Sequence, residues 1–436
     1  MSGFSDFAFS PALFHNIATA GFSEPTPIQR AAIPLALAGN DILGLAQTGT
    51  GKTAAFCLPL LQRLSAPPRS NTVHPGTRKV RALIVAPTRE LAEQIHEVIL
   101  SLGKALNLRS TTIYGGASMN RQLSELRRGV DIVVACPGRL IDHMDRKSID
   151  LGHVETLVLD EADQMFDMGF LPGIRKIVAA LSKDRQTMLF SATMPDEIRK
   201  LSFEILKDPK KVELERGPVA TINHALYPVS QEMKTALLLH LLKTTGSGPI
   251  LVFTKTKHKA SRLADQIAKA GFKTAALQGN LSQNQRARSL EGFRSGKYQI
   301  LVATDIAARG IDVNDISHII NYDVPATGET YIHRIGRTAR ATKSGDAYTF
   351  VTGDDKRLIR DIEKALGKPI ERRMLADFDY KGSAPMIPET VRAETQAKTK
   401  NAQKPQSAQS APQRAAGERP KKAGKPRRRR FRGFGR

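Results

Sequence analysis

The distribution of apolar and polar residues predicts buried strands that alternate with amphipathic helices. Short apolar runs bounded by polar or turn-forming residues are typical of strands covered on both faces of a parallel sheet. The first half of the chain contains such runs at Val80–Ala86, Asp131–Cys136, Thr156–Asp160 and Gln186–Ser191. Segments with helical periodicity lie between them, at Glu90–Ala105 and Met119–Arg128. This order of elements predicts a parallel α/β domain.

The same alternation restarts after a segment of weak periodicity. Further strands are predicted at Ile250–Thr254, Thr274–Gln278, Gln299–Thr304, His318–Asn321 and Ala347–Val351. Helices are predicted at Lys257–Ala270, Gln283–Ser295 and Glu329–Arg337. The intervening stretch 215–230 contains Gly217, Pro218 and Pro228, so we predict a linker there. The pattern therefore predicts two tandem parallel-sheet domains.

Composition narrows the class of protein. The chain has 436 residues, 41% of them apolar, which suits two cores rather than one. Its net charge of +24 indicates a polyanionic partner, most commonly nucleic acid, with a membrane surface as the alternative. No apolar run reaches the roughly 18 residues that a membrane span needs. Residues 1–11 lack the basic and apolar runs of a secretory signal, so we expect a cytoplasmic protein with no membrane association.

The two cysteines favour no special chemistry. Cys57 and Cys136 each lie inside an apolar stretch, and the sequence contains no Cys-x-x-Cys pattern. Two cysteines do not make a disulfide framework or a metal site. We therefore predict two buried thiols in a reducing compartment.

Much of the positive charge is concentrated at the C-terminal end. Residues 381–436 contain sixteen Lys or Arg and three Asp or Glu, a net charge of +13, which leaves +11 for the remaining 380 residues. Large apolar residues are scarce after Val391, so this tail cannot bury enough surface to fold and is predicted to be disordered. It could act as a sequence-independent tether for the polyanionic partner or simply as a solubilising end.

A glycine-rich loop predicts a site for nucleotide phosphates. Residues 46–53 read Ala-Gln-Thr-Gly-Thr-Gly-Lys-Thr and precede a helical segment, Ala54–Leu64. Glycines allow a tight loop whose backbone N–H groups converge on phosphate oxygens at a helix start. Lys52 is expected to contact the β- and γ-phosphates, and the Thr53 hydroxyl to hold Mg²⁺. The strict pattern begins with Gly, where this chain has Ala46.

An acidic pair follows the predicted strand at 156–160. Asp160 is placed to hold Mg²⁺, partly through water, and Glu161 to orient and deprotonate the attacking water. Taken alone, both residues could be capping acids before a helix at Gln164. Together with the Lys52 loop, they predict a site that hydrolyses a nucleotide.

Residues 160–163 read Asp-Glu-Ala-Asp, and with the surrounding motifs the chain resembles the DEAD-box family of ATP-dependent RNA helicases, within helicase superfamily two. The resemblance covers about 4–379 and implies two tandem RecA-like domains. It divides the chain into a Q-motif region (1–30), an N-terminal ATP-binding domain (31–214), a linker (215–230), a C-terminal helicase domain (231–380) and the tail (381–436). Residues 167–170 and the short basic tail are most similar to the bacterial RhlE subgroup.

The resemblance implies an ATP site assembled from several motifs. Residues 21–29 match the Q motif, in which Gln29 reads the adenine edge. The upstream Phe4 would stack on the adenine, although it could instead be a core residue. The implied ATP-binding residues are Phe4, Phe22, Gln29, Ala46, Gln47, Thr48, Gly49, Thr50, Gly51, Lys52, Thr53, Asp305 and Asp312. The implied metal ligands for Mg²⁺ are Thr53 and Asp160.

Residues 331–340 match motif VI of the family. Arg337 and Arg340 lie three residues apart, hence on one face of the predicted helix, and in the family both reach the γ-phosphate as arginine fingers. Ala339 stands where the family usually has Gly. The residues implied in catalysis are Lys52, Glu161, His333, Arg337 and Arg340.

RNA contacts are implied by motifs in both halves of the chain. The motifs are a PTRELA element, a Gly-Gly turn, a TPGR-like element, a Gln-Gly turn and motif V, and they supply Pro87, Thr88, Arg89, Gly115, Gly116, Gly138, Arg139, Gln278, Gly279, Thr304 and Gly310. Cys136 replaces the Thr of the TPGR element, which puts one hydrogen bond in question. RNA read through phosphates and 2′-hydroxyls would be bound without sequence preference.

The resemblance also implies residues that couple the ATP state to RNA binding. Ser191 and Thr193 match the family's SAT element and would lie beside Asp163. A Ser-x-Thr at the end of a strand is, by itself, more often a helix cap.

We therefore expect an ATP- and Mg²⁺-dependent RNA helicase, with ribosomal or mRNA-decay complexes as candidate partners. An ATP-gated RNA clamp and a DNA-translocating helicase of the same superfamily are the alternatives. The presence of Glu161, Arg337 and Arg340 argues against a pure clamp, and the Q motif and the Asp-Glu-Ala-Asp sequence argue against DNA.

Overall fold

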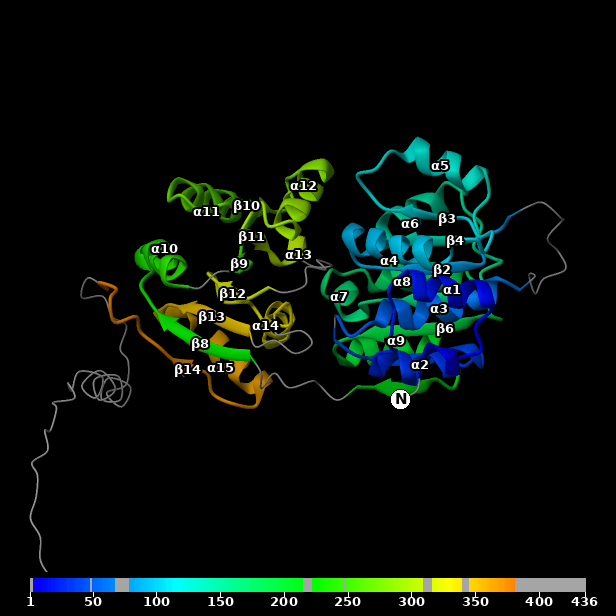
Figure 1. Ribbon diagram of the computed structural model, residues 1–436, viewed down its shortest axis with the longest axis horizontal. Coiled ribbons are helices and arrows are strands. Elements are labelled where there is room, and N and C mark those ends of the chain that lie inside the picture. Colours follow the sequence, from blue (N-terminus) through cyan, green and yellow to red (C-terminus); the bar gives the residue numbers. More distant parts are fainter. Residues whose placement is uncertain are drawn as a thin grey trace, which may run out of the picture. The chain divides into compact units, whose positions relative to one another are not determined.

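The chain folds around two parallel sheets of seven strands, each with helices on both faces (Figure 1). The computed structural model describes residues 3–47, 49–66, 78–214, 222–245, 248–308, 316–338 and 345–380. Every described strand pairing within the two sheets is parallel. This confirms the predicted class of two tandem RecA-like α/β domains. The predicted disordered tail, 381–436, lies outside the described residues.

The first sheet has the strand order β3-β4-β2-β5-β6-β1-β7. Its strands are β1 (Ile42–Leu45), β2 (Ala82–Val85), β3 (Ser110–Ile113), β4 (Ile132–Ala135), β5 (Thr156–Leu159), β6 (Gln186–Ser191) and β7 (Lys210–Glu213). Its helices are α1 (Pro11–Thr19), α2 (Pro27–Leu37), α3 (Lys52–Leu64), α4 (Arg89–Leu102), α5 (Met119–Arg127), α6 (Pro137–Asp145), α7 (Ala162–Asp167), α8 (Leu171–Ala179) and α9 (Asp196–Ile205). The central strands β2, β4, β5 and β6 are buried at every position, which explains their continuous apolar runs.

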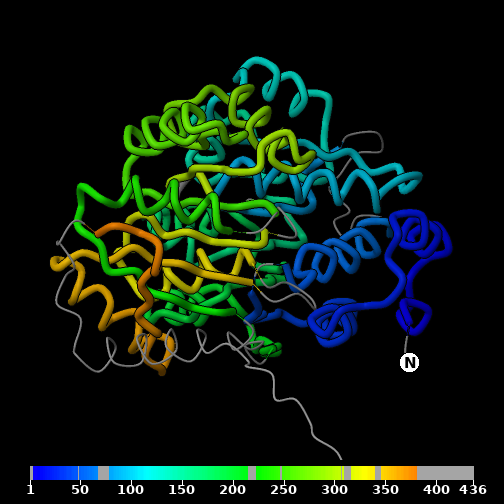
Figure 2. Tube along the Cα trace, turned by 60° about the vertical axis from the view of Figure 1, so that its left-hand side comes forward, coloured from blue at the N-terminus to red at the C-terminus, as the bar shows by residue number. Residues whose placement is uncertain are grey.

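Alternate side chains of these strands form two cores, one on each face of the sheet. Ile84 and Val134 pack with residues of α1 to α4, whereas Leu83 and Leu157 pack with residues of α6 to α9. The N-terminal segment begins with a short 3-10 helix, η1 (Phe4–Asp6), and continues into α1, which packs on α3 and α4 (Figure 2). The loops that contain the predicted motifs follow the carboxyl ends of the strands.

The second sheet has the strand order β10-β11-β9-β12-β13-β8-β14. Its strands are β8 (Ile222–Pro228), β9 (Ile250–Thr254), β10 (Thr274–Leu277), β11 (Ile300–Thr304), β12 (His318–Asn321), β13 (Gly345–Val351) and β14 (Glu371–Arg372). Its helices are α10 (Lys234–Thr244), α11 (Lys257–Lys269), α12 (Gln283–Arg294), α13 (Asp305–Ala308), α14 (Gly328–Ile335) and α15 (Lys356–Leu366). One face packs with α10 and α11, and the other with α12 to α15.

The predicted linker at 215–230 is wrong in its second half. Residues 222–228 form β8, which pairs with β13 over its whole length and belongs to the second sheet. Gly217 and Pro218 misled the prediction by suggesting irregular structure throughout, yet Pro228 is the last residue of the strand. Residues 215–221 lie outside the described part of the chain.

The predicted helix at 329–337 is also too long. Helix α14 ends at Ile335, where Gly336 follows as the C-terminal cap, so Arg337 lies in a turn. Arg337 therefore does not lie on the helical face that the sequence predicts for it, and Arg340 lies outside the described residues. Within the described residues, no helix combines the length and apolar character needed to cross a membrane.

Candidate nucleotide and RNA sites

The loop between β1 and α3 has the conformation that a phosphate-binding loop requires. Gly49 and Gly51 have φ angles of 84° and 92°, in the left-handed region that glycine adopts without strain. Helix α3 begins at Lys52, whose buried Nζ donates a hydrogen bond to the Ala46 carbonyl at 2.8 Å. The loop therefore places a lysine charge and a helix N-terminus together. Thr48 lies outside the described residues.

The predicted adenine-reading residue ties the Q motif to this loop. Gln29 Oε1 accepts a hydrogen bond from the Thr26 backbone N–H at 3.0 Å, and its Nε2 donates to the Gly51 carbonyl at 3.1 Å. Both ends of the amide thus have partners within the protein, and adenine recognition by Gln29 stays a prediction. Phe4 is buried, and its ring centroid lies 6.2 Å from that of Phe22 in an edge-on arrangement. Stacking of Phe4 on adenine also stays a prediction.

Two buried carboxylates follow β5, as the sequence indicates. Asp160 and Glu161 are 2% and 3% exposed, and burial raises the pKa of both, against the lowering effect of the Lys52 charge on Asp160 and the Arg337 charge on Glu161. Glu161 has a left-handed φ of 51°, an unfavourable conformation for a residue with a side chain. Its Oε2 is buried and has no hydrogen-bond partner within the protein. Such an atom is available to a ligand or a reacting water.

Asp160 and the predicted second ligand, Thr53 in the first turn of α3, are oxygen donors that suit Mg²⁺. The ion commonly keeps several waters and phosphate oxygens as ligands. Within the described residues, His, Cys, Asp and Glu form no cluster of three or more that could hold a metal ion. The residues present therefore suit a metal bound together with a nucleotide rather than a metal held by protein alone.

Asp163, Ser191 and Thr193 lie together as predicted. Asp163 Oδ2 accepts hydrogen bonds from the Ala192 N–H, the Thr193 N–H and the Thr193 hydroxyl at 3.1, 2.8 and 2.9 Å. Ser191 Oγ accepts from the Asp163 N–H at 3.2 Å and donates to the Thr193 carbonyl at 2.7 Å. Burial opposes ionisation, but the nearby His333, Lys52 and Thr193 outweigh it and lower the pKa of Asp163. This carboxylate is thus charged and fixed.

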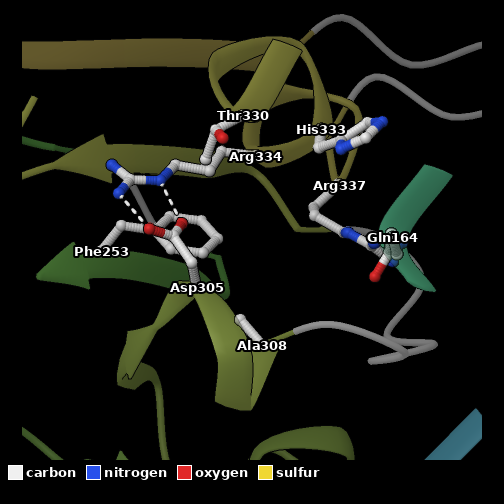
Figure 3. Close-up of a pocket in the computed structure, with 8 residues that line it drawn as sticks. All are labelled: Gln164, Phe253, Asp305, Ala308, Thr330, His333, Arg334 and Arg337. Atoms are coloured by element: carbon white, nitrogen blue, oxygen red, sulfur yellow. Dashed lines mark hydrogen bonds and ion pairs between the residues drawn. The ribbon is translucent and has the colours of Figure 1, made fainter. Parts of the chain in front are cut away.

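The second domain contributes basic side chains to the same region. His333 Nε2 lies 3.5 Å from Asp163 Oδ2, and the buried Arg337 is close enough to Glu161 to affect its pKa. Figure 3 shows both residues in a pocket that Gln164 of α7 also lines. A cation from one domain therefore faces the acidic pair of the other.

Arg334 holds the end of motif VI in place. Its Nε and Nη2 donate to the two carboxylate oxygens of Asp305 at 2.6 and 2.8 Å, and the guanidinium lies over the Phe253 ring at 4.8 Å (Figure 3). The Asp305 carboxylate is therefore already paired, and its predicted ATP contact remains a prediction. Asp312 lies outside the described residues.

Three predicted RNA-binding motifs meet on the first domain. Arg89, at the start of α4, packs against the Gly115–Gly116 turn so closely that a Cβ at position 116 would lie 2.2 Å from its Nη1. Arg139, in the first turn of α6, donates from Nη1 to the Ala117 carbonyl at 3.1 Å. Pro87 and Thr88 follow β2, and Gly138 lies on α6 with open space around its Cα. These motifs form one surface at the carboxyl ends of β2, β3 and β4.

The predicted RNA-binding residues of the second domain occupy corresponding strand ends. Gln278 and Gly279 follow β10, and Thr304 is the last residue of β11. Gln278 donates to Ser261 Oγ at 3.3 Å and accepts from the Asn280 N–H at 2.5 Å, whereas Gly279 has open space around its Cα. Gly310 lies outside the described residues.

The sequence reasoning missed a pair of contacts between the two domains. Arg286 of α12 donates from Nε to Glu90 Oε1 at 2.8 Å, and both side chains are largely buried. Arg89 Nη1 donates to Gln283 Oε1 at 3.3 Å. Glu90 adjoins the predicted RNA-binding Arg89, so these contacts connect that motif to the second domain. The only signal in the sequence was a Gln and an Arg three residues apart in an otherwise ordinary helix.

A glycine loop with its lysine, an acidic strand end and two RecA-like sheets define the class of P-loop nucleotide hydrolases with tandem motor domains. Comparison with known proteins then specifies the family. The DEAD/DEAH box helicase model matches residues 26–201, and the helicase conserved C-terminal domain model matches residues 233–342. The chain belongs to the DEAD/DEAH box helicase family. The relatives described next place it among the DEAD-box RNA helicases of that family.

Curated relatives match most of the chain. It is 45% identical over 370 residues to DEAD-box ATP-dependent RNA helicase 30 of Arabidopsis thaliana, which covers 84% of this chain and 62% of the plant protein. It is 39% identical over 371 residues to DEAD-box ATP-dependent RNA helicase CshA of Bacillus subtilis, which covers 85% of this chain and 73% of CshA. The chain thus spans less than two thirds of the plant relative and nearly three quarters of the bacterial one.

A solved structure supports the fold. The structure of Saccharomyces cerevisiae Dbp5 bound to RNA and ADP BeF3 matches with a TM-score of 0.74 and 30% identity, covering 93% of this chain and 100% of that one.

Proposed function

We propose that this chain hydrolyses ATP at the phosphate loop of the first domain and uses the two domains together to bind RNA and part short duplexes. The observation that supports this most strongly is the buried Glu161, whose Oε2 has no partner in the protein. It lies among the charges of Lys52, Asp160 and Arg337, which all act on its pKa. A carboxylate placed in this way can accept the proton of an attacking water.

The residues of the phosphate loop have separate roles in this proposal. Lys52 and the backbone N–H groups at the start of α3 bind the phosphates, because the helix N-terminus and the lysine present positive charge together. Gln29 orients the loop through the Gly51 carbonyl and reads adenine with the donors and acceptors that remain. Phe4 and Phe22 would form the apolar wall of the adenine site.

Thr53 and Asp160 would hold Mg²⁺. When bound, the ion would offset phosphate charge. Glu161 then orients and deprotonates the water, and Arg337 and Arg340 stabilise the charge that develops on the γ-phosphate. Arginine suits this role because its planar fork matches phosphate oxygens and its charge persists at any physiological pH.

Asp163 couples the nucleotide site to RNA. It is fixed by Thr193 on its own domain and faces His333 of the other domain, so it reports whether the second domain is in position. On the RNA side, Arg286 bonds Glu90, which adjoins the RNA-binding Arg89. Two sets of contacts thus hold the same pair of domains, and binding of ATP and of RNA should favour one another by linkage.

RNA is bound through its backbone in this proposal. The backbone at the exposed Gly116 and Gly279 and the basic Arg89 and Arg139 suit phosphates and 2′-hydroxyls rather than base edges. The likeness to Dbp5, whose structure contains RNA and ADP BeF3, supports this assignment. Closure on a bent strand would displace the complementary strand over a few base pairs, and hydrolysis would remove the γ-phosphate contacts and reopen the domains.

Three finer predictions concern the subgroup, the partners and the location of the protein. The names of the relatives described above do not support the RhlE subgroup, so that assignment stands only on residues 167–170 and the short tail. Ribosomal or mRNA-decay complexes remain candidate partners, and a cytoplasmic location remains a prediction.

ATP hydrolysis measured with and without nucleic acid tests the proposal. Single-stranded RNA of mixed sequence should stimulate hydrolysis at least about tenfold, whereas single-stranded DNA of the same sequence should not. Glu161→Gln should bind ATP and RNA but hydrolyse about 10²-fold more slowly, because it keeps its size but loses the base. Equal stimulation by DNA would favour a DNA translocase, and RNA binding without turnover in the unmodified protein would favour a clamp.

A further inference from the structure

Arg139 contacts one backbone carbonyl, one buried glutamine and one aspartate. Its Nη1 donates to the Ala117 carbonyl at 3.1 Å and lies 3.5 Å from Gln122 Oε1, while Asp142 Oδ2 is 3.6 Å from its Nε. The Nε atom is buried and makes no hydrogen bond within the protein. The guanidinium is therefore largely enclosed, and its direction depends on a few neighbours.

Gln122 is the buried residue of α5, a helix that otherwise exposes most of its polar surface. Its Nε2 donates to the Tyr114 carbonyl at 3.0 Å, which fixes the orientation of the amide and turns Oε1 toward α6. Tyr114 and Ala117 lie directly before and after the Gly115–Gly116 turn. Gln122 and Arg139 thus hold the carbonyls on both sides of that turn.

His143 completes the arrangement one helical turn beyond Arg139. It is fully buried, its Nε2 lies 3.1 Å from Gln122 Oε1, and its Nδ1 lies 2.8 Å from Ser148 Oγ. Because the glutamine oxygen can only accept, Nε2 must carry the hydrogen and donate it. Burial and the Arg139 charge lower the pKa of His143, which favours the neutral ring.

We propose that Gln122 and His143 are positioning residues that hold Arg139 and the Gly-Gly turn in the arrangement that binds RNA. The inference rests on the proposed RNA-binding role of Arg139. In it, His143 fixes Gln122 Oε1, and that oxygen together with the Ala117 carbonyl fixes the guanidinium. Neither Gln122 nor His143 needs to touch RNA.

A double-mutant cycle tests this arrangement through the RNA concentration that half-saturates ATP hydrolysis. His143→Leu should raise that concentration about tenfold in the otherwise unchanged protein, which is the scale of one lost hydrogen bond. In an Arg139→Met background the same change should raise it less than about twofold, because the residue it positions is gone. Hydrolysis at saturating RNA should stay within about twofold of the unchanged protein.

Two further variants separate positioning from general stability. His143→Gln keeps a donor that can reach Gln122 and should restore most of the RNA response, even if His143→Leu folds poorly. His96→Leu is the matched control. His96 Nε2 lies 2.9 Å from Ser110 Oγ in the same domain, and burial lowers the pKa of His96 as it does that of His143. This variant should leave the half-saturating RNA concentration unchanged.

The outcomes are distinct. An equal rise in both backgrounds, or an equal rise for His96→Leu, would show a merely structural role and overturn the inference. A lack of rescue by His143→Gln together with unchanged RNA response in Gln122→Met would also overturn it. If the unchanged protein shows no response to RNA at all, the proposed function itself fails, and this inference fails with it.

Discussion

Each sheet, counted from its own first strand, has the order third, fourth, second, fifth, sixth, first, seventh, so β1 and β8 occupy the same position in their domains. Both strands lead to a helix that begins with Lys-Thr, at Lys52 in α3 and at Lys234 in α10. The connecting segments differ. Residues 46–51 include two glycines with left-handed φ, whereas residues 229–233 contain no glycine. Among the described residues, these equivalent segments have the glycine conformations of a phosphate-binding loop only in the first domain.

The acids that follow the fifth strand of each sheet, Asp160 and Asp323, also differ in whether a cation is already bonded to them. Asp160 accepts a hydrogen bond from the Glu161 N–H at 2.9 Å and has no bonded cation among the described contacts. Asp323 accepts from the Lys255 N–H and from Lys259 Nζ, each at 2.9 Å, so its charge is already paired. Lys234 donates to the Tyr322 carbonyl at 3.2 Å rather than to its own loop. The same architecture thus provides a ligand site in one domain and an internal ion pair in the other.

The comparison suggests a division of labour. In the proposed function the first domain binds the phosphates, and the second domain, which has no glycine at residues 229–233, supplies cations such as Arg337 to the first. Removing Arg337 should therefore have the largest effect of any change outside the first domain. Arg337→Ala should slow hydrolysis by about 10³, the lower end for an arginine finger, with little change in ATP affinity. Single-turnover hydrolysis at saturating ATP and RNA measures this.

Arg337→Lys sharpens the same test. Lysine keeps the charge but lacks the planar fork of arginine. Arg337→Lys should therefore hydrolyse ATP less than about tenfold faster than Arg337→Ala. Normal hydrolysis by either variant would mean that the second domain does not contribute to the reaction through this residue.

Lys52→Met should have a similarly large effect within the first domain. Methionine keeps an apolar stem but removes the charge that meets the phosphates, and loss of one such group costs about 10² to 10³ in rate. The unfolding midpoint should change little, because the Nζ atom has a single described hydrogen bond, to the Ala46 carbonyl. Steady-state hydrolysis and thermal unfolding are the two measurements. Hydrolysis within a few-fold of the unchanged protein would remove the distinction between the two domains.

The equivalent change in the second domain, Lys234→Met, should leave the rate of ATP hydrolysis within about twofold of that of the unchanged protein. Its effect should instead appear in stability, and in a pH-dependent way. Burial lowers the pKa of Lys234, so the unfolded chain binds this proton more tightly than the folded protein does. Stability contributed by this residue therefore rises as the pH rises toward the unfolded value of about 10.4.

Thermal unfolding of both proteins from pH 7 to 9.5 measures that effect. The unfolding midpoint of the unchanged protein should rise relative to that of Lys234→Met as the pH rises. A constant difference would contradict the role of the buried charge, and a loss of ATP hydrolysis would contradict the division of labour itself.

Much of this fold could be predicted from the sequence, because its central strands are buried on both faces and read as continuous apolar runs. The edge strands could not. β7 is exposed at three of its four positions, and β3 alternates between buried and half-buried, so neither has such a run. β8 carries Asn223 and His224 inside a strand, which disguised it as a linker.

The motifs likewise identified which residues form the candidate sites but not what holds them. The bond between Arg286 and Glu90 joins residues 196 positions apart. The contact between His143 and Gln122 depends on how α5 packs against α6. Neither has a local pattern, because each pairing is created only when two elements meet in the fold.

The smallest expected effect concerns the tail. Removing residues 381–436 takes away a charge of +13 and should weaken RNA binding a few-fold at low salt. Log affinity falls with log salt by about 0.7 per phosphate neutralised on single strands, so the truncated protein should also show a shallower salt dependence. Hydrolysis at saturating RNA should be unchanged, because the sequence motifs end at Arg340. An unchanged salt dependence would favour a solubilising role instead.

Strand displacement from a short RNA duplex with a single-stranded extension tests directly whether ATP bound in the first domain drives the motor. With ATP, the unchanged protein should release the labelled strand, while Lys52→Met and Arg337→Ala should bind the same duplex without releasing it. Lys234→Met should release it at the rate of the unchanged protein. Displacement that continues without ATP, or that is lost in Lys234→Met but kept in Lys52→Met, would contradict the claim that ATP bound in the first domain drives the motor.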